Sequence, residues 1–137
     1  MKILVAYDGS ERGRSILEWT ARLARAEADN EVTVISVAAA LEAAPAIADA
    51  VDPSSTIELH RTQLGDAGAM LTTAGVQAET LLRVGNPAEE IINASDDGEY
   101  DLVLIGSTGA HGAMRFLMGS VSDRVVRHAS RPVMVVR

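Results

Sequence analysis

The chain has 137 residues, of which 47% are apolar and 3% aromatic, and a formal net charge of −7. This length predicts one domain over residues 1–137 with an aliphatic core, and the acidic balance argues against a nucleic-acid partner. The lack of cysteine excludes disulfides and thiolate chemistry. Met1 is followed too soon by Asp8 for a signal peptide, and no apolar run has membrane-spanning length. We therefore expect a cytoplasmic protein without a membrane partner.

Apolar runs of strand length alternate with helix-length segments in the first half of the chain. Residues 2–7 predict a buried strand, and Asp8-Gly9-Ser10 predicts the turn after it. Apolar residues with helical spacing then predict a helix from about residue 10 to about residue 29. β-Branched residues predict a second strand over residues 32–37. The Ala-rich segment 38–51 favours neither a helix nor a strand.

The alternation continues in the second half. A helix is predicted from about residue 52 to residue 73, ended by Gly75. Further predicted elements are strands over residues 77–84, 102–105 and 132–137 and a helix over Ser120–His128. Asn86-Pro87-Ala88-Glu89 marks another helix start, with Asn as N-cap and Pro at the first helical position.

The helix that begins after Asn86 is followed by an acidic run of Asp96, Asp97, Glu99 and Asp101. Carboxylates at a helix C-terminus oppose the helix dipole, so we expect this helix to end by about Ser95. Consecutive carboxylates in a turn seldom converge on one ion, and we interpret the run as a solvated turn without a metal.

The alternation predicts an α/β fold with three layers, a five-stranded parallel sheet covered by helices on both faces. Right-handed crossovers bring the carboxyl ends of all strands to one edge, where ligands bind beside the first strand. Asp8 follows the first strand and Gly106 ends the fourth. Ser36, Val37 and Ala38 end the second strand, so these residues are expected to face one crevice.

A glycine-rich segment follows the fourth strand. Gly106-Ser107-Thr108-Gly109, Gly112 and Gly119-Ser120 offer backbone amides that can approach a phosphate closely, and Ser120 begins a helix whose dipole favours an anion. A surface loop whose glycines only permit turns is the alternative. Placement directly after a buried strand favours phosphate binding.

The spacing Gly106-x2-Gly109-x9-Gly119-Ser120, with Asp8 after the first strand and Arg131-Pro132-Val133 near the end, resembles the ATP-binding branch of the universal stress protein family. The resemblance implies an adenine nucleotide alpha hydrolase-like fold with strand order 3-2-1-4-5. It also implies a regulatory stress-response protein that binds ATP or another adenine nucleotide, with Mg²⁺ reaching Asp8 only through the nucleotide.

The resemblance assigns adenosine contacts to Ala6, Asp8 and Val37, and ribose and phosphate contacts to the glycine segment. It further implies a homodimer through antiparallel pairing of Val133–Val136. The candidate nucleotide contacts are Ala6, Tyr7, Asp8, Ser36, Val37, Gly106, Ser107, Gly109, His111, Gly112, Gly119, Ser120 and Val121.

Family members often carry a basic or imidazole side chain where this chain has Thr108 and Ala110. Only His111 and Arg115 remain in the segment to counter phosphate charge, so AMP and ADP stay candidates beside ATP. Ser120 has no evident base, and we expect at most slow ATP hydrolysis. A nucleotide-independent homodimeric interaction protein of the same fold is the alternative function. His60 has no partner that the sequence identifies.

Overall fold

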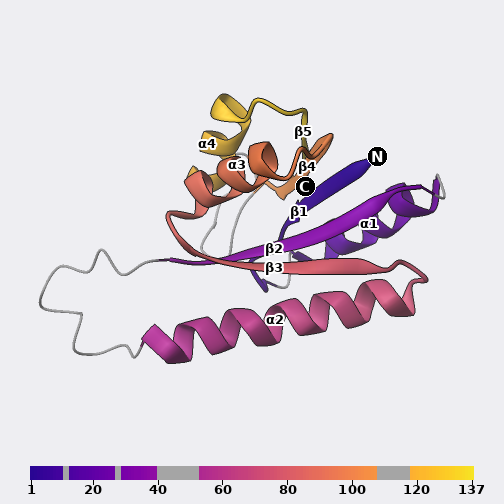
Figure 1. The fold of residues 1–137 in the computed structure, drawn as a ribbon, viewed down its shortest axis with the longest axis horizontal. Helices are drawn as coiled ribbons and strands as arrows, with labels where there is room; N and C mark the ends of the chain where they lie inside the picture. The colour runs from indigo at the N-terminus through magenta and orange to yellow at the C-terminus, as the bar shows by residue number, and fades with distance from the viewer. Residues whose placement is uncertain (11–12, 27–28, 40–52, 108–117) are drawn as a thin grey trace, which may run out of the picture.

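The computed structural model describes residues 1–10, 13–26, 29–39, 53–107 and 118–137. Strands and helices alternate along the chain (Figure 1). The elements are β1 (Lys2–Ala6), α1 (Gly13–Ala26), β2 (Glu31–Ala39), α2 (Pro53–Thr73), β3 (Ala78–Gly85), α3 (Pro87–Asp97), β4 (Leu102–Gly106), α4 (Ser120–His128) and β5 (Val133–Val136). Among these helices, none is long and apolar enough to cross a membrane.

The strands form one parallel sheet in the order β3-β2-β1-β4-β5, which confirms the expected order. Ile3 of β1 lies between Val32 of β2 and Leu102 of β4 in the register. The strand order reverses at β1, since the chain continues from β1 to one side and later returns to its other side. A ligand crevice is therefore expected over the carboxyl ends of β1 and β4.

Two hydrophobic clusters cover the two faces of the sheet. Alternate β1 residues enter different clusters because side chains of a strand point to opposite faces. Ile3 and Val5 pack with α1 and α2, whereas Leu4 packs with α3 and α4. Figure 1 shows α2 along one face of the sheet and α3 and α4 on the other. This arrangement explains the continuous apolar strands, since both faces of the sheet are buried.

The start of α3 confirms the N-cap prediction, but its predicted end is wrong. Asn86 Oδ1 accepts hydrogen bonds from the amides of Ala88 (3.1 Å) and Glu89 (3.3 Å). The helix continues to Asp97, two residues beyond the expected end at Ser95. Ser130 Oγ donates a hydrogen bond to Asp96, and Arg131 Nε lies 3.9 Å from the Asp96 carboxylate. These partners offset the unfavourable charge at the helix end.

β2 is longer than the sequence predicted. It continues past Val37, because Ala38 and Ala39 pair with Val84 and Gly85 of β3. The rest of the Ala-rich segment, residues 40–51, lies outside the described residues. The longer strand carries the β2 backbone toward the edge of the sheet where the strands end, and Ala39 reaches the candidate site there.

Candidate functional site

A cleft of about 570 Å³ lies over the carboxyl ends of β1, β2 and β4. The first turns of α1, α3 and α4 and one side of α2 complete its wall. The lining residues are Ala6, Tyr7, Asp8, Ser10, Gly13, Ile16, Ile35, Val37, Ala39, Thr56, His60, Pro87, Ile91, Ile105, Gly106, Gly119, Ser120, Val121 and Ser122. The cleft thus occupies the place that the reversal of strand order predicts.

Most of the described candidate residues meet in this cleft. The candidates that line it are Ala6, Tyr7, Asp8, Val37, Gly106, Gly119, Ser120 and Val121. Two others do not line the cleft but contact residues that do. Ser36 of β2 is buried and hydrogen-bonded to His60, and the Ser107 carbonyl accepts a hydrogen bond from the Gly119 amide at 2.8 Å. Gly109, His111 and Gly112 lie outside the described residues.

The turn after β1 is closely packed. Asp8 Oδ1 accepts a hydrogen bond from the Ser10 amide at 3.0 Å, which is an Asx-turn. Gly9 has a positive φ of 73°, and a Cβ there would lie 2.1 Å from the Gln63 side chain. The positive φ favours glycine at this position, and the end of the Gln63 side chain of α2 occupies the space beside it. The Asx-turn therefore holds the Asp8 carboxylate in the lining of the cleft.

Tyr7 and Gly13 form the α1 side of the cleft. A Cβ on Gly13 would lie 2.6 Å from the Tyr7 ring and 3.5 Å from Asp8 Oδ1. Burial, followed by the charges of Asp8 and Asp66, raises the pKa of Tyr7. A phenol is neutral at physiological pH even at its ordinary pKa, and the upward shift favours this form further, so Tyr7 can donate a hydrogen bond.

The N-terminus of α4 faces the cleft from beyond β4. Gly119 is the N-cap residue, with φ −64° and ψ 154°, and its carbonyl accepts the first helical bond from the Asp123 amide at 2.9 Å. Because glycine has no side chain, it cannot satisfy the amides of the first turn. The cleft-lining residues Ser120 and Val121 belong to that turn, so their amides and the helix dipole favour an anion there.

Ser122 was not predicted as a site residue. Its side chain is 3% exposed, and its Oγ donates a hydrogen bond to the Gly106 carbonyl at 2.5 Å. This bond ties the first turn of α4 to the end of β4, and so it fixes the helix N-terminus relative to the sheet. The sequence places Ser122 in the same first helical turn as Ser120. It does not identify the Gly106 carbonyl, sixteen residues away, as the partner of the Ser122 hydroxyl.

His60 was also missed. Its Nδ1 lies 2.7 Å from Oγ of Ser36, which is 1% exposed. Burial lowers the pKa of His60, and the charge of Asp8 acts in the opposite direction. His60 also lines the cleft, on the side of α2. A polar pair thus joins α2 to β2 at this end of the site.

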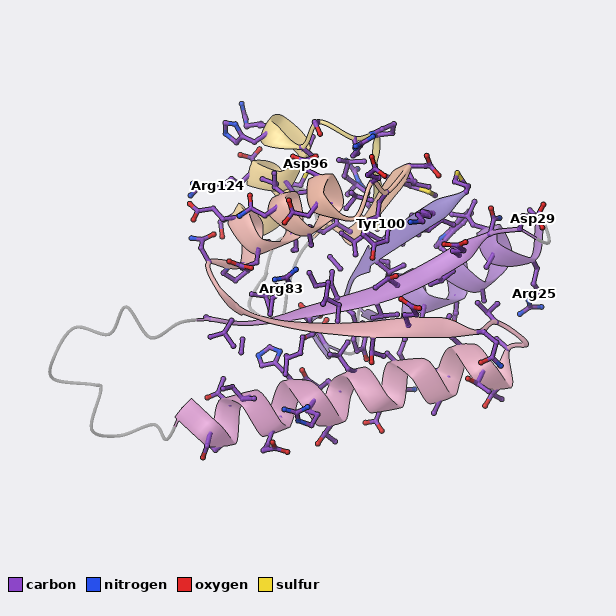
Figure 2. The ribbon with its side chains drawn as sticks, in the orientation of Figure 1. Arg25, Asp29, Arg83, Asp96, Tyr100 and Arg124 are labelled. Atoms are coloured by element: carbon purple, nitrogen blue, oxygen red, sulfur yellow. The ribbon has the colours of Figure 1, made fainter. Side chains whose placement is uncertain are left out.

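The described arginines around α4 are engaged in ion pairs. Arg124 lies 2.7 Å from the Glu89 carboxylate, and Arg127 lies 2.9 Å from that of Asp123. In Figure 2, Arg124 lies on the α3 and α4 side, at the outer end of these helices. Arg83 projects from β3 on the same side of the sheet, beside Val37 in the register. In the described ranges, no cluster of His, Asp and Glu side chains could hold a metal ion.

Residues 1–137 match the model of the universal stress protein family. Universal stress protein YxiE of Bacillus subtilis is 30% identical, over 99% of this chain and 98% of its own length. The solved structure of MJ0577, a universal stress protein of Methanocaldococcus jannaschii, has a TM-score of 0.86 at 25% identity and covers 98% of this chain and 94% of its own. A universal stress protein from Archaeoglobus fulgidus, solved in complex with dAMP, has a TM-score of 0.72 at 25% identity and covers 100% of this chain and 98% of its own.

Proposed function

Because the chain belongs to the universal stress protein family, we propose that it binds an adenine nucleotide in the cleft and acts as a regulatory protein through nucleotide-dependent conformation or partner binding. The chain works as one domain over residues 1–137. The ligand is ATP, ADP or AMP, and any Mg²⁺ arrives with the nucleotide. The dAMP held by the Archaeoglobus fulgidus relative supports this class of ligand.

The N-terminus of α4 at the rim of a largely apolar cleft carries the proposal. The amides of its first turn and the helix dipole suit a phosphate, and Ser120 adds an exposed hydroxyl at that position. The aliphatic side chains of Ile35, Val37 and Ile91 line the cleft elsewhere and suit a flat, apolar base. A nucleotide has both kinds of surface, whereas a free phosphate uses only one.

The orientation of the nucleotide follows from the order of the strands. The phosphate lies against α4, next to β4, and the base extends across β1 toward β2. Asp8, at the end of β1, then stands under the nucleoside and can accept a hydrogen bond from it. Arg124 and Arg127 of α4 do not line the cleft and are paired with carboxylates, so the phosphate is held mainly by backbone amides.

Substitution of Gly119 tests the proposal, with a matched control. Aspartate and asparagine are both good N-cap residues, so Gly119→Asp and Gly119→Asn keep or raise the stability of α4. Only aspartate places a negative charge where the phosphate is expected. We expect Gly119→Asp to weaken AMP and ATP binding by about tenfold or more in calorimetric titrations, and Gly119→Asn to weaken it much less. Equal nucleotide affinities of the two variants would contradict the phosphate position.

The parent protein provides the broader test. If ATP, ADP and AMP all fail to bind it at millimolar concentration, the nucleotide proposal fails, and a nucleotide-independent interaction protein of the same fold becomes the better interpretation. Mass spectrometry of a nucleotide that copurifies with the protein gives a direct identification of the ligand.

We also propose a homodimer through β5. This strand is an edge of the sheet. On its inner side, the Pro132 carbonyl accepts a hydrogen bond from the Val103 amide of β4, and the Val136 carbonyl accepts one from the Ser107 amide just after β4. Backbone groups of a strand alternate in direction, so those of Val133 and Val135 point to the open edge. Such an edge is suited to pairing with a second copy.

A further inference from the structure

We propose that His60 is a base-contacting residue that contributes to ligand specificity, with Ser36 as the residue that positions it. This inference rests on the nucleotide proposal above and deepens it. The two residues lie 2.7 Å apart, between Nδ1 and Oγ, and join α2 to β2. His60 lines the cleft, whereas Ser36 is buried and does not line it.

The position of His60 assigns it to the base and not to the phosphate. Ser36 belongs to β2, and the sheet order places β1 and β4 between β2 and the side of the cleft formed by α4. Each step between neighbouring strands is about 4.8 Å, so β2 and β4 are roughly 10 Å apart. A nucleotide whose phosphate meets α4 therefore brings its base toward β2 and the His60 side.

One face of α2 forms this wall of the cleft. Thr56 and His60 are four residues apart on the helix and both line the cleft, as expected for neighbours on a helix face. Gln63, three residues further along α2, packs against Gly9. A Cβ added at Gly9 would lie 2.1 Å from the Gln63 side chain. The contact with Gly9 fixes α2 against the turn that carries Asp8. His60 is thus held from two directions, by Ser36 and by the position of its helix.

The chemistry of the imidazole suits the edge of a purine. Nδ1 is engaged with Ser36, which leaves Nε2 as the ring atom for a ligand. If the Ser36 hydroxyl donates to Nδ1, Nε2 carries the proton and donates to a ring nitrogen of the base; in the other tautomer, Nε2 accepts from an amino group. Adenine offers both a ring-nitrogen acceptor and an amino donor on adjacent atoms of its edge. Because the Ser36 hydroxyl can donate or accept, the pair permits either contact while it holds the orientation of the ring.

The test compares AMP with ribose 5-phosphate, which has the same phosphate but no base. Both are measured by displacement of a fluorescent adenine nucleotide from the parent, His60→Ala, Ser36→Ala and Arg61→Ala. Arg61 is the control, because it is the next residue of α2 and its exposed side chain pairs with Glu58. Circular dichroism confirms that each variant is folded.

We expect His60→Ala to weaken AMP binding about five- to tenfold, the effect of one hydrogen bond in a partly buried site. The affinity for ribose 5-phosphate stays within about twofold, and Arg61→Ala resembles the parent in both measurements. Ser36→Ala keeps the imidazole but not its orientation, so it weakens AMP binding by a smaller factor.

Two results overturn the inference: an unchanged AMP affinity in His60→Ala, or a loss of affinity that is equal for AMP and ribose 5-phosphate. The second result would show that His60 only supports the fold of the cleft. Failure of the parent to bind AMP is a different outcome, because it appears before any substitution is made and refutes the proposed function together with this inference.

Discussion

Removal of the Ser122 hydroxyl should destabilise the protein by an amount that the structure allows us to estimate. Ser122 Oγ donates to the Gly106 carbonyl at 2.5 Å, and the serine is 3% exposed. A net hydrogen bond contributes about 1 kcal/mol, and a fully buried carbonyl left without its donor costs about 1–3 kcal/mol, of which the partly buried Gly106 carbonyl should show the lower part. Since a small side chain is removed and α4 can relax slightly, we expect Ser122→Ala to lower the free energy of unfolding by about 1–2 kcal/mol.

Urea unfolding followed by circular dichroism measures this change, and comparable m-values in the parent and the variants show that the same transition is compared. For a chain of this length, the loss corresponds to a decrease in Tm of roughly 3–8 °C. Ser120→Ala is the control, because Ser120 begins the same helix turn with an exposed side chain. It should change stability by less than about 0.5 kcal/mol. Equal stability of Ser122→Ala and the parent would refute the assigned role of this bond.

Three further predictions concern other parts of the molecule. Asn86→Ala removes the acceptor for the amides of Ala88 and Glu89, and should lower the unfolding free energy by about 1 kcal/mol in the same urea assay. Burial lowers the pKa of His60 below 6.5, against the effect of Asp8; the unfolded chain therefore binds the proton more readily, and stability falls as the pH drops from above 6.5 toward the folded-state pKa. His60→Gln should flatten that part of the pH profile of the unfolding free energy, and an unchanged slope would contradict it. Val135→Pro removes an amide that points to the open edge of β5 and should give a monomer in sedimentation without loss of the fold, whereas an intact dimer would exclude pairing through this strand.

The sequence predicted the parts of the fold that depend on neighbouring residues. The N-cap at Asn86 is an example, because the cap and the two amides that it accepts from lie within four residues. The parallel sheet followed from continuous apolar strands, which are typical of a sheet buried on both faces. The expected edge of the sheet, with Asp8 and Gly106, also holds the cleft.

The parts that the sequence did not predict depend on contacts between distant residues. The predicted end of α3 is too early, because the unfavourable interaction of Asp96 with the helix dipole is offset by Ser130 and Arg131. These two partners are more than thirty residues away in the sequence. Likewise, nothing local to His60 identifies Ser36 as its partner, 24 residues earlier in the chain. The contact forms only when α2 packs on β2. A helix and a strand differ in their side-chain periodicity, so the sequence pattern alone does not pair a residue of one with a residue of the other.

In the proposed binding mode, the two ends of the cleft contact different parts of the nucleotide, and their contributions can be separated. At α4 the attraction comes from amides and a dipole, whose field acts within the first turn of the helix. Arg124 and Arg127 lie outside the cleft lining and are engaged with carboxylates, so phosphates beyond the first gain little from these two residues. At α2 the proposed selection comes from the His60 imidazole, which is hydrogen-bonded to the buried Ser36 hydroxyl. Substitutions at Gly119 and His60 should therefore have additive effects on the free energy of AMP binding, since they lie on opposite sides of β1 and share no partner.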